Sequence, residues 1–329
     1  MVSTNPYVTP NLMNNISRAK PDASNTLNIG LIKISGIDSI SFLQGQLSND
    51  MNELQSGSEK KWHYSGYCNQ KGRLIALLKV WREGDDVFVL MNHDLIDNTV
   101  DRLRKYVMRS KVVIEVIETA RCSGYASIEN LKTVLEKSDS NFIEKLNDEP
   151  NAVCRVGKLS VLTIANRYLL VDKANSIDSN GSNKMMSSAD WFAEDINDGL
   201  PDVSIDSSEL FIPQMLNLDL LGGINFKKGC YTGQEIVARM HYLGKLKQRM
   251  FVCEFIQGDA ITLQSGSNIY SDAELSKSAG TIVSSDSGSK KLLAVLRLTE
   301  LDNTHYVNDT TIIKVAAEQA YKIPLTVDK

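Results

Sequence analysis

The pattern of apolar residues changes near Gly244, and this change limits the folds that the 329-residue chain can adopt. Before Gly244, strand-like stretches such as 27–35 and 74–81 alternate with stretches of helical periodicity, one of which begins at Asn92 or Asp94. Beyond Gly244, short apolar stretches recur between Gly, Ser and Asp residues and show little helical signal. The first pattern is typical of an α+β body of antiparallel sheets covered by helices, and the second of a small β-barrel or sandwich.

These patterns predict three parts of the chain. Residues 1–25 are polar and are expected to form a loose arm. Residues 26–244 form the α+β body, in which two similar rounds of strands and helices are compatible with two intertwined subdomains. Residues 245–329 form the small C-terminal β-barrel.

The sequence also predicts several individual helices and a hairpin within the body. Apolar residues recur at helical spacing over 96–107 and predict one buried stripe. The stretches 159–164 and 168–171 predict a hairpin. Asp38 is expected to cap one short helix, and a second short helix is expected to begin at Trp191.

Composition excludes several classes of protein. Hydrophobic residues make up 42% of the chain and charged residues 23%, which is ordinary for a soluble globular protein. The apolar runs are strand-sized and no secretory signal pattern stands at the N-terminus, so we expect a cytoplasmic protein with no membrane partner. The formal net charge of −4 argues against a general footprint for nucleic acid and leaves a local one open.

The chain has five cysteines and four histidines. The cysteines are odd in number, widely scattered and free of any Cys-x-x-Cys pair, which argues against a disulfide framework, a structural zinc site and a self-contained iron–sulfur motif. The histidines lie far apart and form no His-x-x-x-His pair. We therefore predict reduced thiols and no metal site.

The stretch 227–235, with the sequence KKGCYTGQE, combines two cations, two glycines and a cysteine. Thr232 with Glu235 three residues later predicts a capping box at the start of a helix. Cys230 would then lie two residues before a helix N-terminus, where partial positive charge favours the thiolate over the thiol. The alternative is a cysteine buried at a tight corner.

The chain resembles a known family in several places. The longest match starts at Phe211-Ile212-Pro213-Gln214 and includes the motif residues Lys228, Gly229, Cys230, Tyr231, Gly233, Gln234, Glu235 and Arg239. Shorter matches are Phe42-Leu43-Gln44-Gly45-Gln46-Leu47 with Asp50, Cys68-Asn69-Gln70-Lys71-Gly72-Arg73, and Lys105-Tyr106 with Ser110-Lys111-Val112. In these motifs the chain is similar to the YgfZ family of folate-binding, tRNA-modifying proteins, which are relatives of the glycine-cleavage T-protein, an aminomethyltransferase.

The resemblance implies a T-protein-like body that binds tetrahydrofolate or another reduced folate, followed by a C-terminal β-barrel. It implies a role in tRNA modification through the maintenance of iron–sulfur enzymes, which are then partners of the protein, and leaves direct contact with tRNA open. Cys230 becomes the functional thiol, as a nucleophile, a sulfur or one-carbon relay, or a transient iron ligand. The candidate folate-binding residues are Trp191, Asn69, Lys71, Arg73, Asn197 and Gln234.

Two departures from the relatives bear on activity. Aminomethyltransferases carry an essential aspartate soon after the Asn-x-x-Gly turn, whereas this chain has Ile75 and Ala76 there. Because amine transfer onto folate needs an anion to steady an iminium or to accept a proton, aminomethyl transfer is disfavoured. Asn197 stands where relatives have a glutamate that grips the pterin, so any hydrogen bond there lacks charge assistance.

Two hypotheses of different classes follow. In the first, Cys230 carries chemistry beside a bound folate. In the second, the protein is a non-catalytic, folate-responsive scaffold or regulator that docks partner enzymes through the Cys230 loop. Trp191 either stacks on the pterin or is an ordinary buried tryptophan. A basic stretch after the motif either meets phosphate or the polyglutamate tail of folate, or is a solvated face; it consists of Arg239, His241, Lys245, Lys247 and Arg249.

Overall fold

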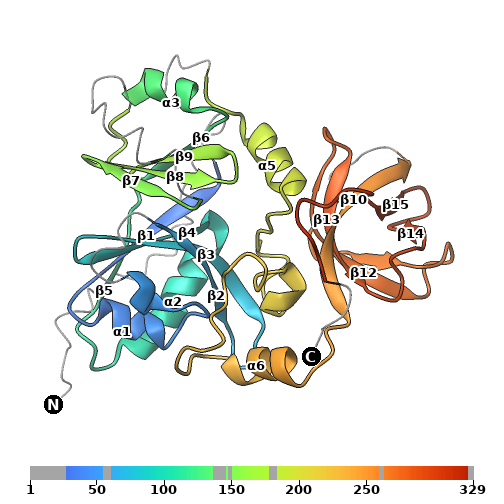
Figure 1. The fold of residues 1–329 in the computed structure, drawn as a ribbon, viewed down its shortest axis with the longest axis horizontal. Coiled ribbons are helices and arrows are strands. Elements are labelled where there is room, and N and C mark those ends of the chain that lie inside the picture. The colour runs from blue at the N-terminus through green and yellow to red at the C-terminus, as the bar shows by residue number, and fades with distance from the viewer. Residues whose placement is uncertain are drawn as a thin grey trace. The chain divides into compact units, whose positions relative to one another are not determined.

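The computed structural model describes residues 27–54, 61–135, 146, 150–177, 184–258 and 263–324. The chain divides into two compact units (Figure 1). The first unit contains residues 1–65 and 78–188, and the second contains residues 66–77 and 189–329. The arm predicted over residues 1–25 lies outside the described residues.

A five-stranded antiparallel sheet has the order β2-β3-β4-β1-β5. Its strands are β1 (Ile29–Ser35), β2 (His63–Cys68), β3 (Leu74–Glu83), β4 (Asp86–Asn92) and β5 (Val113–Val116). The tip of the β2–β3 hairpin, residues 66–77, clusters with the second unit. Most residues of β3 and β4 are buried, so these strands read as continuous apolar runs.

Two helices accompany this sheet in the first unit, α1 (Ser39–Gln44) and α2 (Ile96–Val107), together with the short 3-10 turns η1 (Met51–Leu54) and η2 (His93–Leu95). The predicted apolar stripe of α2 is confirmed: Ile96, Val100, Leu103 and Val107 are all buried. Asp38 is the N-cap residue of α1, as predicted, but its side chain makes no capping bond; its carboxylate accepts a hydrogen bond from the Lys111 backbone N–H at 2.7 Å instead.

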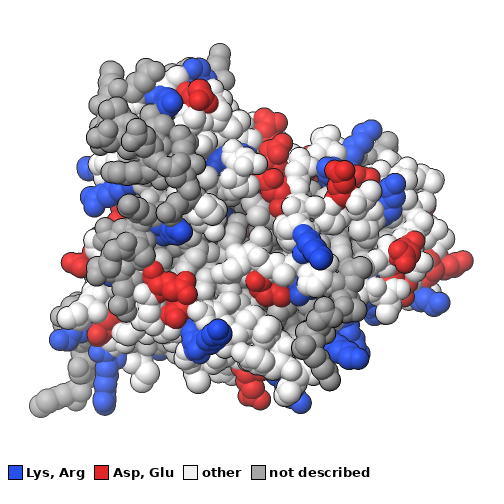
Figure 2. Space-filling model, viewed as in Figure 1, with Lys and Arg blue, Asp and Glu red and all other residues white. Residues whose placement is uncertain are grey.

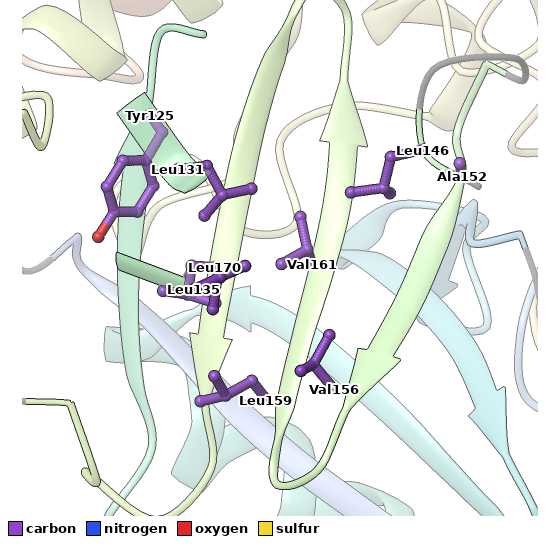
Figure 3. Close-up of a cluster of buried hydrophobic side chains, with 9 residues drawn as sticks. All are labelled: Tyr125, Leu131, Leu135, Leu146, Ala152, Val156, Leu159, Val161 and Leu170. Carbon is purple, nitrogen blue, oxygen red and sulfur yellow. The ribbon is translucent and has the colours of Figure 1, made fainter. Parts of the chain in front are cut away.

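A second antiparallel sheet of the first unit has the order β6-β9-β8-β7. Its strands are β6 (Arg121–Tyr125), β7 (Val153–Val156), β8 (Leu159–Ile164) and β9 (Arg167–Asp172). The helix α3 (Ile128–Leu135) follows β6 in the sequence. The predicted hairpin is β8–β9, whose register pairs Ile164 with Arg167. Figure 3 shows the buried side chains of α3 and the strands gathered in one core, which includes Leu131, Val161 and Leu170. Burying each such side chain stabilises the fold by about 1.5–3 kcal/mol.

The predicted C-terminal barrel is confirmed as a closed sheet in the order β10-β13-β12-β11-β14-β15. Its strands are β10 (Gln248–Gln257), β11 (Asn268–Tyr270), β12 (Ser278–Asp286), β13 (Lys291–Arg297), β14 (His305–Tyr306) and β15 (Ile312–Val315). Phe251, Ile282, Leu292 and Ile313 belong to its buried core. Closure leaves no free sheet edge, which removes unpaired backbone groups.

The rest of the second unit lies between the hairpin tip and the barrel in sequence. It contains α5 (Ser188–Asn197), the 3-10 turn η3 (Pro213–Leu216) and α6 (Gln234–Tyr242). Gly199 ends the α5 segment in a left-handed conformation with φ 63°, as the sequence predicted. Within the part of the chain that the structure describes, no helix combines the length and the apolar character needed to cross a bilayer.

Candidate functional site

Asn69 organises the turn between β2 and β3. Its backbone N–H donates to the Arg73 carbonyl at 2.9 Å, and its carbonyl accepts from the Gly72 N–H at 2.9 Å. Its side-chain oxygen accepts from the backbone N–H of Lys71 at 2.9 Å and of Arg73 at 3.1 Å. Four hydrogen bonds thus fix the turn, and the side chains of Lys71 and Arg73 remain exposed on it.

The start of α6 lies directly against this turn. Gly233 has φ 82°, and a Cβ on it would lie 2.4 Å from the Asn69 carbonyl oxygen and 2.9 Å from the Gly72 Cα. A Cβ on Gly72 would in turn lie 2.8 Å from the Cβ of Ile236. Glycine is therefore required at both positions, and the contact brings Gln234 next to the turn that carries Lys71 and Arg73.

The predicted capping box of α6 is wrong. The helix begins at Gln234, its N-cap is Gly233, and no side chain caps it. The close backbone approach of Gly233 to the hairpin turn fixes a left-handed cap, so Thr232 lies one residue outside it. Cys230 consequently lies three residues before the N-cap instead of two. Glu235 is exposed in the first turn, where a carboxylate is favourable.

Cys230 stands on an exposed segment between two anchored positions. Gly229 and Cys230 are exposed, whereas Lys228 and Tyr231 on either side are buried. The Lys228 ammonium lies 5.1 Å from the centre of the Tyr231 ring, at cation–π distance. Burial raises the pKa of Tyr231, and the nearby Cys68 adds to the rise. The thiol is therefore presented by a short loop that is held on both sides.

The other cysteines differ from Cys230 in accessibility. All five lie in the described ranges, and Cys230 alone is exposed. Cys154 is half-buried, and Cys68, Cys122 and Cys253 are buried. Burial raises the pKa of Cys68 and of Cys122 to about 12, which suppresses their thiolates at neutral pH. The motif thiol is thus the most accessible to a reagent or a partner.

Glu209 is a residue of the site that sequence reasoning missed. Its carboxylate accepts a hydrogen bond from the Asn69 side-chain amide at 2.5 Å, and its backbone N–H donates to the Leu74 carbonyl at 2.7 Å. It has φ 65°, a conformation that is uncommon for a residue other than glycine. The segment of Glu209 therefore runs along the start of β3 and brings a carboxylate to a turn that has none of its own. Because the two residues are 140 positions apart, no local pattern signals the pair.

The guanidinium of Arg73 is also attached to this segment, because it donates to the Leu210 carbonyl. The hairpin turn, the Glu209 segment and the start of α6 form one cluster, which we name the turn cluster. It contains Asn69, Lys71, Arg73, Glu209, Gly233 and Gln234. Four of the six predicted folate-binding residues, Asn69, Lys71, Arg73 and Gln234, therefore lie in it.

The other two predicted folate-binding residues lie on α5. Trp191 is buried, with 4% of its surface exposed. The Asn197 side-chain oxygen accepts a hydrogen bond from the Lys291 ammonium of β13 at 3.1 Å. The structure therefore links Asn197 to the barrel, and any ligand that binds its oxygen must share or replace the Lys291 bond.

The basic stretch after the motif divides into exposed and buried parts. Arg249 is 5% exposed and binds the Asp219 carboxylate through two hydrogen bonds of 3.1 and 2.8 Å. It also donates to the side-chain oxygen of Asn217 at 3.1 Å. Arg249 is thus a buried structural cation and is unavailable to phosphate or folate. The exposed residues are Arg239, His241, Lys245 and Lys247.

The residues with metal-ligating side chains do not gather. Within the described ranges, no group of three or more His, Cys, Asp or Glu side chains is placed to hold a metal ion.

Comparison with known proteins identifies the fold. No family model matches the chain. Among solved structures, the chain is similar to the glycine cleavage system aminomethyltransferase T from Bartonella henselae, with a TM-score of 0.67 and 12% sequence identity. The similarity covers 89% of this chain and 84% of that chain. The protein therefore has a T-protein-like fold, with antiparallel sheets, accompanying helices and a closed C-terminal barrel.

Proposed function

We propose that the protein is a folate-binding accessory protein for tRNA modification, which acts by maintaining iron–sulfur enzymes, and that Cys230 is its functional thiol. The proposal joins the T-protein-like fold to the resemblance of the Cys230 motif to the YgfZ family. The observation that carries it is the exposure of Cys230 on a loop anchored by buried Lys228 and Tyr231. A soft thiolate that reaches the surface can attack an electrophile or ligate iron in a partner.

The residues of the turn cluster fit the acidic end of a folate. Lys71 and Arg73 are exposed cations on the hairpin turn, and they suit the carboxylates of the glutamate tail. Gln234 adds an amide beside them. Bound folate would supply a one-carbon carrier, while these side chains would bind and orient its tail.

The pterin end has a more specific requirement. If Trp191 and Asn197 hold the pterin, as the resemblance implies, the ligand must reach a tryptophan that is only 4% exposed. It must also compete with Lys291 for the Asn197 oxygen. These two conditions make folate binding by α5 testable apart from folate binding by the turn cluster.

Aminomethyl transfer remains disfavoured by the residues that follow the turn. Ile75 and Ala76 are buried in β3 and offer no carboxylate. Glu209 does reach the turn, but its carboxylate accepts the Asn69 amide hydrogen bond. We assign it a positioning role, in which it holds Asn69 and so the turn that carries Lys71 and Arg73.

The decisive experiment compares Cys230→Ser with Cys154→Ser in a deletion strain, with tRNA thiomodification as the readout. Serine keeps the size and hydrogen bonding of cysteine and removes the soft thiolate. We expect Cys230→Ser to lose the modification and Cys154→Ser to keep it, with both purified proteins melting near the wild type. Full activity of Cys230→Ser would reject thiol chemistry and favour the scaffold hypothesis, in which the loop docks a partner without reacting.

Folate binding is tested independently of the thiol. Tetrahydrofolate titrated into the protein is expected to quench tryptophan fluorescence, and Trp191→Leu is expected to abolish that quenching. Substituting Lys71 and Arg73 together with glutamine is expected to weaken binding, more strongly for polyglutamylated folate than for the monoglutamate form. Absence of any heat or spectral change at saturating folate would reject a folate cofactor while leaving the thiol test untouched.

A further inference from the structure

Two loops of the first unit form a basic and apolar projection that the proposed function does not use. The first loop is 36–38, and the second is 108–111 at the end of α2. The Asp38 carboxylate accepts from the Lys111 N–H at 2.7 Å, and a Cβ on Gly36 would lie 2.0 Å from the Lys111 carbonyl oxygen. The two loops are therefore in direct contact. We name this region the α2 projection and define it as residues 36–38 and 105–111.

The α2 projection exposes large apolar side chains. Ile37 is 86% exposed, Met108 is 78% exposed and Tyr106 is 42% exposed. Met108 is the C-cap residue of α2 and has φ 37°, a positive value that is uncommon for a residue other than glycine. At 78% exposure the Met108 side chain lies outside the core, and Ile37 stands on the loop that contacts residues 108–111 through Lys111. Large apolar side chains exposed on adjoining loops are typical of interaction sites.

Cations outnumber carboxylates in the α2 projection, which holds Lys105, Arg109 and Lys111 and one carboxylate, Asp38. Residues 102–114 contain five Arg and Lys residues and no carboxylate, in a chain whose formal net charge is −4. Arg102 donates to Asn98 and Arg104 lies 3.8 Å from Asp101, so these two are engaged within the helix. The remaining three, Lys105, Arg109 and Lys111, are exposed, and none of them lies within ion-pair distance of a carboxylate in the described part of the chain. Figure 2 shows Lys and Arg side chains, with Asp or Glu side chains beside them, at the lower-left edge of the first unit, where Figure 1 labels α1, α2 and β5.

We propose that the α2 projection binds the surface of an anionic phospholipid bilayer, with Ile37 and Met108 inserted among the headgroups and the three exposed cations held at the lipid phosphates. This partner satisfies both properties of the region. Cations near an anionic leaflet are attracted to it, and protruding apolar side chains insert at the boundary between headgroups and acyl chains. The sequence-based expectation of no membrane partner was drawn from strand-sized apolar runs and the lack of a secretory signal, and neither feature reports a surface site of this kind.

A nucleic acid fits the observations less well. Phosphates would suit the cations, but single-stranded bases stack on aromatic rings, and the two most exposed apolar side chains here are aliphatic. The half-exposed Tyr106 offers one ring only. Aliphatic side chains that stand clear of the protein surface leave water when they enter a bilayer, and this transfer is favourable.

The test is cosedimentation of the full-length protein with vesicles of phosphatidylcholine that contain about one third phosphatidylglycerol, against vesicles of phosphatidylcholine alone. The wild type is expected to bind the anionic vesicles in preference, and the preference should fade at high salt. Ile37→Ser with Met108→Ser is expected to weaken binding at least about tenfold. Lys105→Gln with Arg109→Gln is expected to weaken it by about fivefold per charge removed.

Ile205→Ser is the matched control, because Ile205 is 64% exposed beside the exposed acidic residues Asp202 and Asp206. It should bind vesicles as the wild type does. The melting temperature of each variant reports folding, and the charge variant keeps the test valid if the apolar variant is unstable.

Equal binding of the wild type to both kinds of vesicle, or binding that neither pair of substitutions weakens, would overturn the proposal. Tight binding of a single-stranded RNA oligonucleotide that needs Lys105 and Arg109 but not Ile37, with no vesicle binding, would assign the surface to nucleic acid instead. Thiol alkylation and folate titration do not involve the α2 projection. A failure of the bilayer proposal and a failure of the proposed function are therefore separate results.

Discussion

Replacing Gly233 by alanine tests the contact on which the presentation of Cys230 depends. Gly233 caps α6 with φ 82°, and the position of an added Cβ is set by the backbone. That Cβ would lie 2.4 Å from the Asn69 carbonyl oxygen, 2.9 Å from the Gly72 Cα and 3.1 Å from the Gly72 backbone nitrogen. All three are backbone atoms, so no side chain can rotate away to make room.

Two effects add in the Gly233→Ala variant. Holding alanine in the left-handed region costs about 1–2 kcal/mol. Relieving the overlap requires the hairpin turn and the helix start to separate, and overpacking of this kind costs about 1–3 kcal/mol. We therefore expect a loss of stability of about 2–5 kcal/mol. For a domain of about 150–250 residues, each kcal/mol lowers the melting temperature by about 2–4 °C.

Gly229→Ala is the matched control in the same motif. Gly229 has no positive φ, and a Cβ on it would meet nothing within 4 Å, so alanine there should be nearly neutral. Calorimetric melting of both variants gives the comparison, and the rate of iodoacetamide labelling of Cys230 reports the loop. Gly233→Ala should melt at least about 4 °C below Gly229→Ala and label at a changed rate. Equal melting temperatures would refute the claim that the turn and the helix start are in backbone contact.

Three further predictions concern the second unit. Asp219→Ala leaves the buried Arg249 guanidinium without its carboxylate, which should destabilise the unit by about 3–5 kcal/mol, and Asp219→Asn, which keeps an acceptor, should lose less in calorimetric melting. His305 is fully buried, and burial lowers its pKa below the ordinary 6.5. The unfolded chain therefore takes up a proton that the folded barrel excludes, so urea stability should fall as pH drops below 6.5, and His305→Leu should remove that part of the slope. Lys291→Met frees the Asn197 oxygen and should raise tetrahydrofolate affinity by about fivefold if Asn197 contacts the pterin, whereas Lys291→Arg should not; unchanged affinity in both would separate Asn197 from the folate site.

Elements with a period in their apolar residues could be predicted from the sequence. The stripe of α2, the β8–β9 hairpin and the short strands of the barrel all repeat a simple spacing, because one face of each packs against a core. The switch from helical to strand-only spacing near Gly244 likewise marks the approach to β10. The local spacing of apolar residues was sufficient to predict these elements, because that spacing depends only on which side chains are buried.

Contacts between distant segments could not be predicted in the same way. Asn69 was expected to bind folate, but the identity of its partner Glu209 depends on the path of a segment that begins beyond α5. Asn197 was matched to a pterin-binding position, and its bond to Lys291 exists only because the barrel closes. The capping box failed for a related reason: Thr232 and Glu235 have the right spacing, but a backbone contact with the hairpin turn fixes the cap at Gly233.

The two glycines of the motif therefore have different roles. Gly233 permits a close backbone contact that attaches the loop to the hairpin turn, whereas Gly229 meets nothing and leaves space beside the thiol. Lys228 is buried against Tyr231 and so anchors the loop that carries Cys230. A loop attached at both ends and open in the middle holds a sulfur atom at the surface with little conformational entropy left to lose. Such a thiol meets a partner at a lower entropic cost than one on a long flexible loop, and this advantage is the same for a nucleophile, an iron ligand and a docking contact.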